Sequence, residues 1–268
     1  MRTSSIENFE RVVSSRRLNS YRRYFKTKTM DEAIGLYLWN GEVSSCFASH
    51  LAYFEIVLRN SVHRAMSMFC TRGRSTSAHW YDQIWKTLSP TTQRRIQEVR
   101  QRRSKVTLDA DEMVASLSLG FWPAVLRNID HAHANLILPA VFPFHPLSAP
   151  VPQWRDTKVR RRALAFVFEL HAFRNRLAHH EPLWKFGAMR DASGTPDATN
   201  RLPSRSPAES IDRLRGLLAL IEDAAGFIDR AMRDDLGQPP GANAWTSCSP
   251  SVASSGIVAA SMCPIRRF

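Results

Sequence analysis

An arginine, an asparagine and a histidine stand within six residues of one another in this chain, as Arg174, Asn175 and His179. A guanidinium can hold a phosphate group through a planar fork of N–H donors. An imidazole can take or give a proton near neutral pH. Arg174 and His179 together could therefore cleave RNA without a metal ion, which makes them candidate catalytic residues.

The motif stands at the end of a predicted amphipathic helix that covers residues 156–180. At 100° per residue, Phe166, Leu170, Phe173 and Leu177 fall within about 60° of one another. We expect this apolar stripe to face the core and to orient the polar residues between its members.

Measured from Phe166, the polar residues lie at about 80° for Arg174, 140° for His171, 180° for Asn175 and 220° for His179. They therefore share the outward half of the predicted helix. His180, at about 320°, returns toward the apolar stripe, so we interpret it as a packing residue.

A purely structural interpretation of the motif stays open. Arg174 could pair with Glu169 or Glu181, while the two histidines cap the helix before Pro182. Basic side chains near a helix C-terminus are favourable through the helix dipole alone.

A second polar cluster has i, i+4 spacing and therefore lies on one face of a predicted helix over residues 43–69. It consists of Glu55, Arg59 and His63, with Asn60 beside them. One interpretation is a surface ion pair between Glu55 and Arg59, which would contribute little to stability. The other is that this face lines the same cleft as the motif and holds RNA or contributes a catalytic residue.

No metal site is expected. His131 and His133 stand two residues apart, but no carboxylate or cysteine follows at matching helical spacing. The four cysteines are far apart in the sequence and form no CxxC pair.

The chain has 268 residues and a formal net charge of +13. Thirty-one of its thirty-seven basic residues are arginines, and such a surplus attracts polyanions, of which nucleic acid is the commonest in cells. The run of arginines from Arg94 to Arg103 could follow a phosphate backbone or form a solvated helix face.

The start of the chain has no apolar h-region, and prolines interrupt the longest apolar stretch, residues 134–147. We therefore expect a cytoplasmic protein that does not enter a membrane.

Helical periodicity predominates and no β-alternation persists, so the sequence predicts an all-α bundle. We divide the chain into a basic N-terminal segment (1–29), a helical domain (30–233) and a disordered tail (234–268). Further helices are predicted over residues 31–39, 91–105, 109–126 and 207–233.

Residues 174–180 resemble the R-N-x-x-x-H signature of the HEPN superfamily. The surrounding sequence, residues 170–184, is similar to its Abi-like (abortive infection) bacterial branch. Two further segments, residues 53–60 and residues 117–122, resemble that branch in the expected order. The resemblance covers roughly residues 30–230.

The resemblance implies a HEPN-like helical bundle, to which the helical pattern of the chain adds an N-terminal helical extension. It also implies a homodimer and a metal-independent endoribonuclease without a cofactor. Arg174 and His179 would be its catalytic pair, with Asn175 beside them. His179 would move the proton of the ribose 2′-hydroxyl or of the leaving 5′-oxygen. Arg174 would stabilise the charge on the phosphorane-like transition state, and the products would be a 2′,3′-cyclic phosphate and a 5′-hydroxyl.

The sequence therefore favours an RNA-cutting phage-defence (abortive infection) effector or toxin. The alternatives are a non-catalytic RNA- or nucleotide-binding helical dimer and a purely structural helical dimer. The expected partners are RNA, a second copy of the chain and an antitoxin. Residues expected to bind RNA or to support the catalytic ones are His171, His180, Glu55, Arg59, Asn60 and His63.

Overall fold

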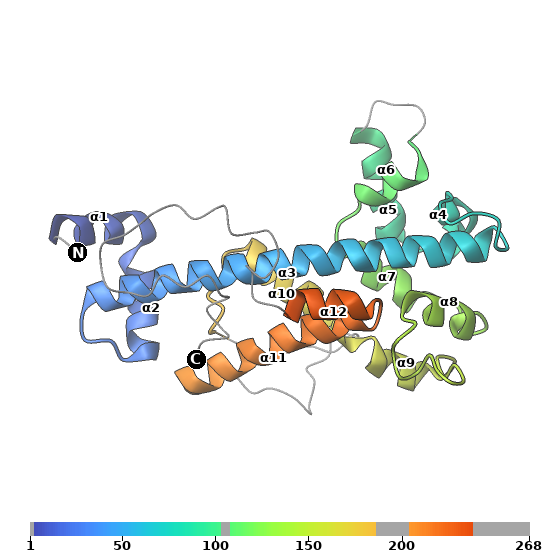
Figure 1. Ribbon diagram of the computed structural model, residues 1–268. Coiled ribbons are helices and arrows are strands. Elements are labelled where there is room, and N and C mark those ends of the chain that lie inside the picture. Colours follow the sequence, from blue (N-terminus) through green and yellow to red (C-terminus); the bar gives the residue numbers. More distant parts are fainter. Residues whose placement is uncertain (1–2, 103–107, 186–203, 238–268) are drawn as a thin grey trace.

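The computed structural model describes residues 3–102, 108–185 and 204–237, and within these ranges it contains helices and connecting loops but no strand. This confirms the all-α class. The longest helix, α3 (Met30–Cys70), extends through most of the molecule (Figure 1). Thr29 and Glu32 form a capping box that starts it, which satisfies two backbone N–H groups at the helix start.

The sequence predicted two helices where α3 is continuous, with a break expected near Gly41. Gly41 costs only about 1 kcal/mol relative to alanine inside a helix. The neighbouring Asn40 is buried, and its side-chain oxygen accepts a 2.8 Å hydrogen bond from the backbone N–H of Leu183. Buried residues on both sides of this point, Ile34 before it and Val43 after it, also anchor the helix in the core.

Two N-terminal helices, α1 (Thr3–Val13) and α2 (Ser15–Phe25), lie beside the start of α3 (Figure 1). Leu18 and Tyr21 of α2 are fully buried, and burial raises the pKa of Tyr21 to about 12. Residues 1–29 were predicted as a basic N-terminal segment, and α2 of this segment packs against α3.

Short helices gather around the C-terminal half of α3 (Figure 1). They are α4 (Trp80–Gln83), the 3-10 helix η1 (Trp85–Thr87), α5 (Pro90–Arg102), α6 (Ala110–Ala115), α7 (Phe121–Arg127) and α8 (Ala134–Val141). Residues 109–126 were predicted as one helical stretch that Gly120 and Pro123 break near its end. They form α6 and α7, which are separated by a loop that contains Gly120, whereas Pro123 lies inside α7.

The motif helix is α10 (Ala165–Ala178), and it follows the short helix α9 (Thr157–Ala163). The prediction of one helix over residues 156–180 missed a tight turn at Leu164, whose side chain is buried. The apolar stripe is as expected: Phe166, Leu170 and Phe173 are buried, and Phe173 packs edge-on against Phe47 of α3 with the ring centroids 4.9 Å apart.

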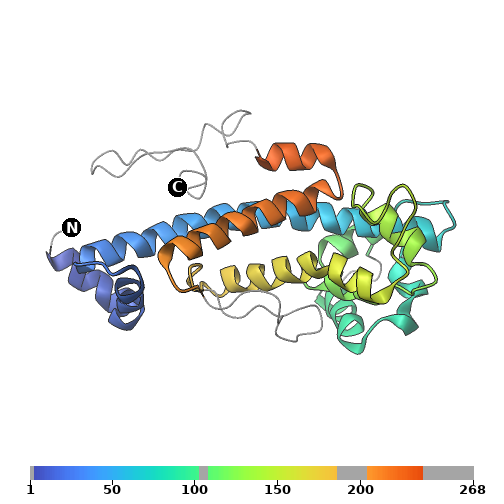
Figure 2. The same ribbon diagram turned by 90° about the horizontal axis from the view of Figure 1, so that it is seen from below.

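Both α10 and α11 (Pro207–Gly226) run alongside α3 (Figure 2). The predicted helix over residues 207–233 is interrupted after α11, because the carbonyl of Phe227 accepts a 3.0 Å hydrogen bond from the backbone N–H of Phe144. The last helix, α12 (Arg230–Gly237), includes residues 234–237, which composition had placed in the tail. The remainder of the predicted tail, residues 238–268, lies outside the described residues.

Candidate active site

A groove with a volume of about 620 Å³ lies between the first half of α3 and the end of α10. Tyr37 and Glu55 of α3 line it from one side, and Arg174 and Leu177 of α10 line it from the other. Arg17 of α2 also contributes to the wall. The motif helix therefore borders a cavity large enough for part of a nucleotide chain.

The groove exists because one face of α3 carries small side chains. They recur at helical spacing, so they share one side of the helix. The lining residues of this kind are Gly41, Ser44, Ser45, Ala48 and Ala52. Large residues at these positions would close the space beside α10.

Arg174 is partly buried in the wall of this groove. In the described parts of the chain its guanidinium forms no ion pair and no hydrogen bond. The expected structural partner Glu181 instead binds Arg176, whose Nε donates to the Glu181 carboxylate at 3.2 Å. The Arg174 guanidinium therefore keeps its donors for a ligand.

Glu55 is an acidic group on which the charge of Arg174 acts. Burial raises the pKa of the Glu55 carboxyl, and the charges of Arg174 and Arg59 and a hydrogen bond from the backbone N–H of Leu119 oppose that shift. Leu119 belongs to the loop before α7. The three segments that carried the family resemblance thus meet at Glu55, from α3, from this loop and from α10.

His171 and Asn175 lie one turn apart on α10, and Asn175 Nδ2 is 3.2 Å from His171 Nε2. Burial lowers the pKa of His171, and the positive charges of Arg95 and Arg174 lower it further. The imidazole is therefore held neutral at physiological pH, beside two cations. Both His171 and Asn175 are partly buried, so they face a neighbouring element more than open solvent.

The helix ends before the two adjacent histidines. His179 is the C-cap of α10 and its side chain is exposed. His180 follows with φ of 52°, in the left-handed region, and is exposed as well. The expectation that His180 packs toward the core is wrong, because the 100° projection does not extend beyond Ala178. His180 lines the groove, whereas His179 is not among its lining residues.

The turn after the motif is held by residues from distant parts of the chain. Arg17 of α2 donates a hydrogen bond to the backbone carbonyl of His180. Trp184 is buried between the rings of Tyr21 and Tyr24, at centroid distances of 5.2 and 4.3 Å. Ser210 of α11 donates to the carbonyl of Trp184 at 2.9 Å. Sequence reasoning missed this support, because no local pattern links α2 to residues 180–184.

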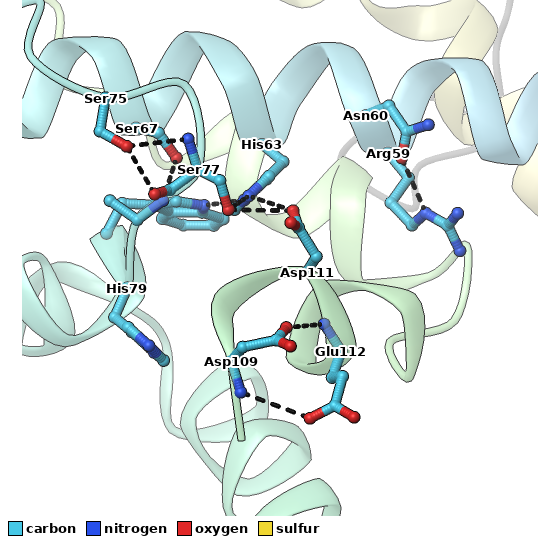
Figure 3. A network of polar contacts seen from close by, with 12 residues as sticks. Arg59, Asn60, His63, Ser67, Ser75, Ser77, His79, Asp109, Asp111 and Glu112 are labelled. Carbon is cyan, nitrogen blue, oxygen red and sulfur yellow. Dashed lines mark hydrogen bonds and ion pairs between the residues drawn. The ribbon is translucent and has the colours of Figure 1, made fainter. Parts of the chain in front are cut away.

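The second predicted cluster is divided by the fold. His63 is buried, and its Nδ1 accepts a 2.9 Å hydrogen bond from the indole N–H of Trp80. Its Nε2 lies 3.2 Å from both Ser77 Oγ and Asp111 Oδ1 (Figure 3). The proton is therefore on Nε2, which donates to these oxygens, and His63 joins the loop after α3 to α6. It does not line the groove.

Arg59 and Asn60 lie on α3, about one turn before His63 (Figure 3). Arg59 Nε donates to Asn60 Oδ1 at 3.2 Å. The ion pair considered between Arg59 and Glu55 is not formed, although the charge of Arg59 acts on the Glu55 carboxyl. Neither Arg59 nor Asn60 is among the residues that line the groove.

The described residues include no group of three or more side chains placed to hold a metal ion. His133, considered above as a ligand, packs its ring against Phe69 at a centroid distance of 4.9 Å. None of the helices described is long and apolar enough to cross a membrane.

Comparisons with known proteins give no relative: no family model, no curated protein and no solved structure matches this chain.

Proposed function

We propose that this protein is a metal-independent endoribonuclease of the HEPN type, with Arg174 and His179 as its catalytic pair and Asn175 beside them. The observation that supports this most is the state of Arg174. Its guanidinium lies in a groove wall without an ion-pair or hydrogen-bond partner among the described residues. A partly buried cation of this kind is suited to bind a phosphate oxygen.

In the proposed reaction His179 takes the proton of the ribose 2′-hydroxyl, and the 2′-oxygen attacks the adjacent phosphorus. The bond from phosphorus to the 5′-oxygen breaks, and that oxygen receives a proton from water, to which the protonated His179 returns the proton it took. The products are a 2′,3′-cyclic phosphate and a 5′-hydroxyl. Arg174 stabilises the negative charge that grows on the phosphoryl oxygens in the transition state.

We propose further that the active site is shared by two chains. Arg174 lines the groove, while His179 is exposed beyond the end of α10 and does not line it. Two motif helices related by a two-fold axis would bring Arg174 of one chain to His179 of the other. A two-fold dimer is the commonest soluble assembly.

The biological role proposed is that of a cytoplasmic phage-defence effector or toxin that cuts cellular RNA and is restrained by an antitoxin. The net charge of +13 supports a polyanionic substrate. The separation of His179 from the groove favours one alternative, a non-catalytic RNA- or nucleotide-binding helical dimer.

The test of this proposal is to incubate purified protein with end-labelled single-stranded RNA in excess EDTA and to identify the product ends. Fragments with 2′,3′-cyclic phosphate ends support it. Binding of the RNA without fragmentation would support the alternative.

A further inference from the structure

The groove beside α10 has a distinct end next to α2, where two large apolar side chains line it. These are Tyr37 and Leu38, whereas Gly41, Ser45 and Ala48 further along α3 are small. Leu38 is 49% exposed and Tyr37 is partly exposed, so apolar surface faces the open space of the groove. Exposed apolar surface inside a concave site is typical of a place where a ligand binds.

The Tyr37 ring is held in place by its neighbours. Phe9 of α1 and Tyr21 of α2 each pack against it edge to face, with the ring centroids 5.8 Å apart. The guanidinium carbon of Arg17 also lies 5.8 Å from the centroid of this ring. A ring fixed in this way loses little conformational freedom when a ligand packs on it, which favours binding.

Arg174 belongs to a different position along the groove. Its neighbour Phe173 packs against Phe47 of α3, with the ring centroids 4.9 Å apart. Tyr37 precedes Phe47 on the same helix by ten residues, which is about 15 Å at the rise of an α-helix. The groove therefore carries a cation and a fixed aromatic ring at separate positions.

Single-stranded RNA has the chemistry that fits both positions. Its phosphates pair with guanidinium groups, and its unpaired bases stack on aromatic side chains. A duplex does not fit, because its bases are paired and stacked on one another. A mononucleotide reaches one position only, since nucleotides that follow each other at about 3.4 Å need several repeats to cover about 15 Å.

We propose that Tyr37, with Leu38 beside it, binds an unpaired base of single-stranded RNA several nucleotides away from the phosphate held by Arg174. The choice of RNA as the ligand rests on the proposed function. The site itself rests on a fixed ring and exposed apolar surface in the same groove as Arg174. It makes unpaired RNA, in preference to duplex RNA, the substrate of the protein.

The test measures the affinity of the full chain for a single-stranded 2′-O-methyl RNA of about eight nucleotides, which spans the distance and is not cleaved through the 2′-oxygen. Tyr37→Leu should weaken this affinity about fivefold or more, because a base loses its stacking on the ring. Tyr37→Phe should bind like the wild type, since it keeps the face of the ring. A duplex of the same sequence should bind all three proteins alike.

Tyr53→Leu is the matched control, since Tyr53 is an exposed tyrosine of α3 that does not line the groove. Equal affinities of Tyr37→Leu and Tyr53→Leu for the single strand would overturn the proposal. A second pair of variants applies if Tyr37→Leu fails to fold, as checked by circular dichroism. Leu38→Glu should weaken binding more than Leu136→Glu, which adds the same charge at an exposed position of α8, and equal effects would then overturn the proposal.

Two further outcomes of these measurements are distinct. If sedimentation shows that Tyr37→Leu weakens self-association while its RNA affinity is unchanged, this end of the groove is a contact between two copies of the chain and the proposal is wrong. If the wild type does not bind the single strand at all, the proposed function fails together with this site. Because the RNA is not cleaved, binding that depends on Tyr37 supports the site even if the protein proves not to cut RNA.

Discussion

Arg17 donates a hydrogen bond to the backbone carbonyl of His180, a residue 163 positions later in the chain. This contact fixes the left-handed turn that follows His179. The second helix of the molecule, which belongs to the basic N-terminal segment, therefore supports the end of the candidate catalytic motif.

Arg17→Ala should lower RNA cleavage more through kcat than through KM, because the turn that carries His179 loses its anchor. The loss of one hydrogen bond should reduce the free energy of unfolding by about 1 kcal/mol. Arg16→Ala is the matched control, since Arg16 is the exposed neighbour on the same helix. Steady-state kinetics and urea unfolding of both variants check this, and equal kcat values would show that the contact does not position the site.

Stability should fall as the pH drops below about 6.5, partly through His63. Burial lowers the pKa of His63 in the folded state, against the opposing effect of Asp111, while the unfolded residue titrates near 6.5. Between these pKa values the unfolded chain binds a proton that the native chain does not, so acid favours unfolding. Protonation also breaks the bond from Trp80 to Nδ1.

The free energy of unfolding in urea at pH 7.5 and at pH 5.5 checks this prediction. His63→Gln should lose less stability between the two pH values than the wild type does. His131→Gln, at an exposed position, should lose as much as the wild type. The same loss in all three proteins would exclude His63 as a source of the pH dependence.

A shared active site predicts complementation between two inactive variants. Arg174→Ala and His179→Ala should each fail to cut RNA, and their mixture should recover part of the activity. Some of the heterodimers then contain one intact site and one site that lacks both residues. A mixture that stays inactive although sedimentation shows exchanged dimers would place both catalytic residues in one chain.

The sequence was sufficient for the helical class and for the core face of α10, because Phe166, Leu170 and Phe173 recur at helical spacing and are buried. The same arithmetic failed for His180, since the helix ends at Ala178 and the angle per residue changes there. Helix breaks such as the one at Leu164 leave no proline or glycine in the sequence, so periodicity could not locate them.

The candidate site was predictable only in part. Arg174 and Asn175 were recognised from the motif, but the position of Arg95 depends on how α5 packs near α10. The spacing of His63 and Glu55 in the sequence places them on one face of α3. However, α3 contacts different helices along its length. Two residues on the same face can therefore have different partners. The partners of His63 are Trp80 and Asp111, which a pattern within α3 does not indicate.

The most direct test of the proposed function compares RNA cleavage in EDTA by the wild type, His179→Ala and His180→Ala. Both histidines are exposed, and the replacement at position 180 keeps the backbone carbonyl that Arg17 binds. We predict that His179→Ala abolishes cleavage while its circular dichroism spectrum and melting temperature stay close to those of the wild type, and that His180→Ala continues to cut. Cleavage by His179→Ala at the wild-type rate would contradict the assignment of His179 as the residue that moves the proton.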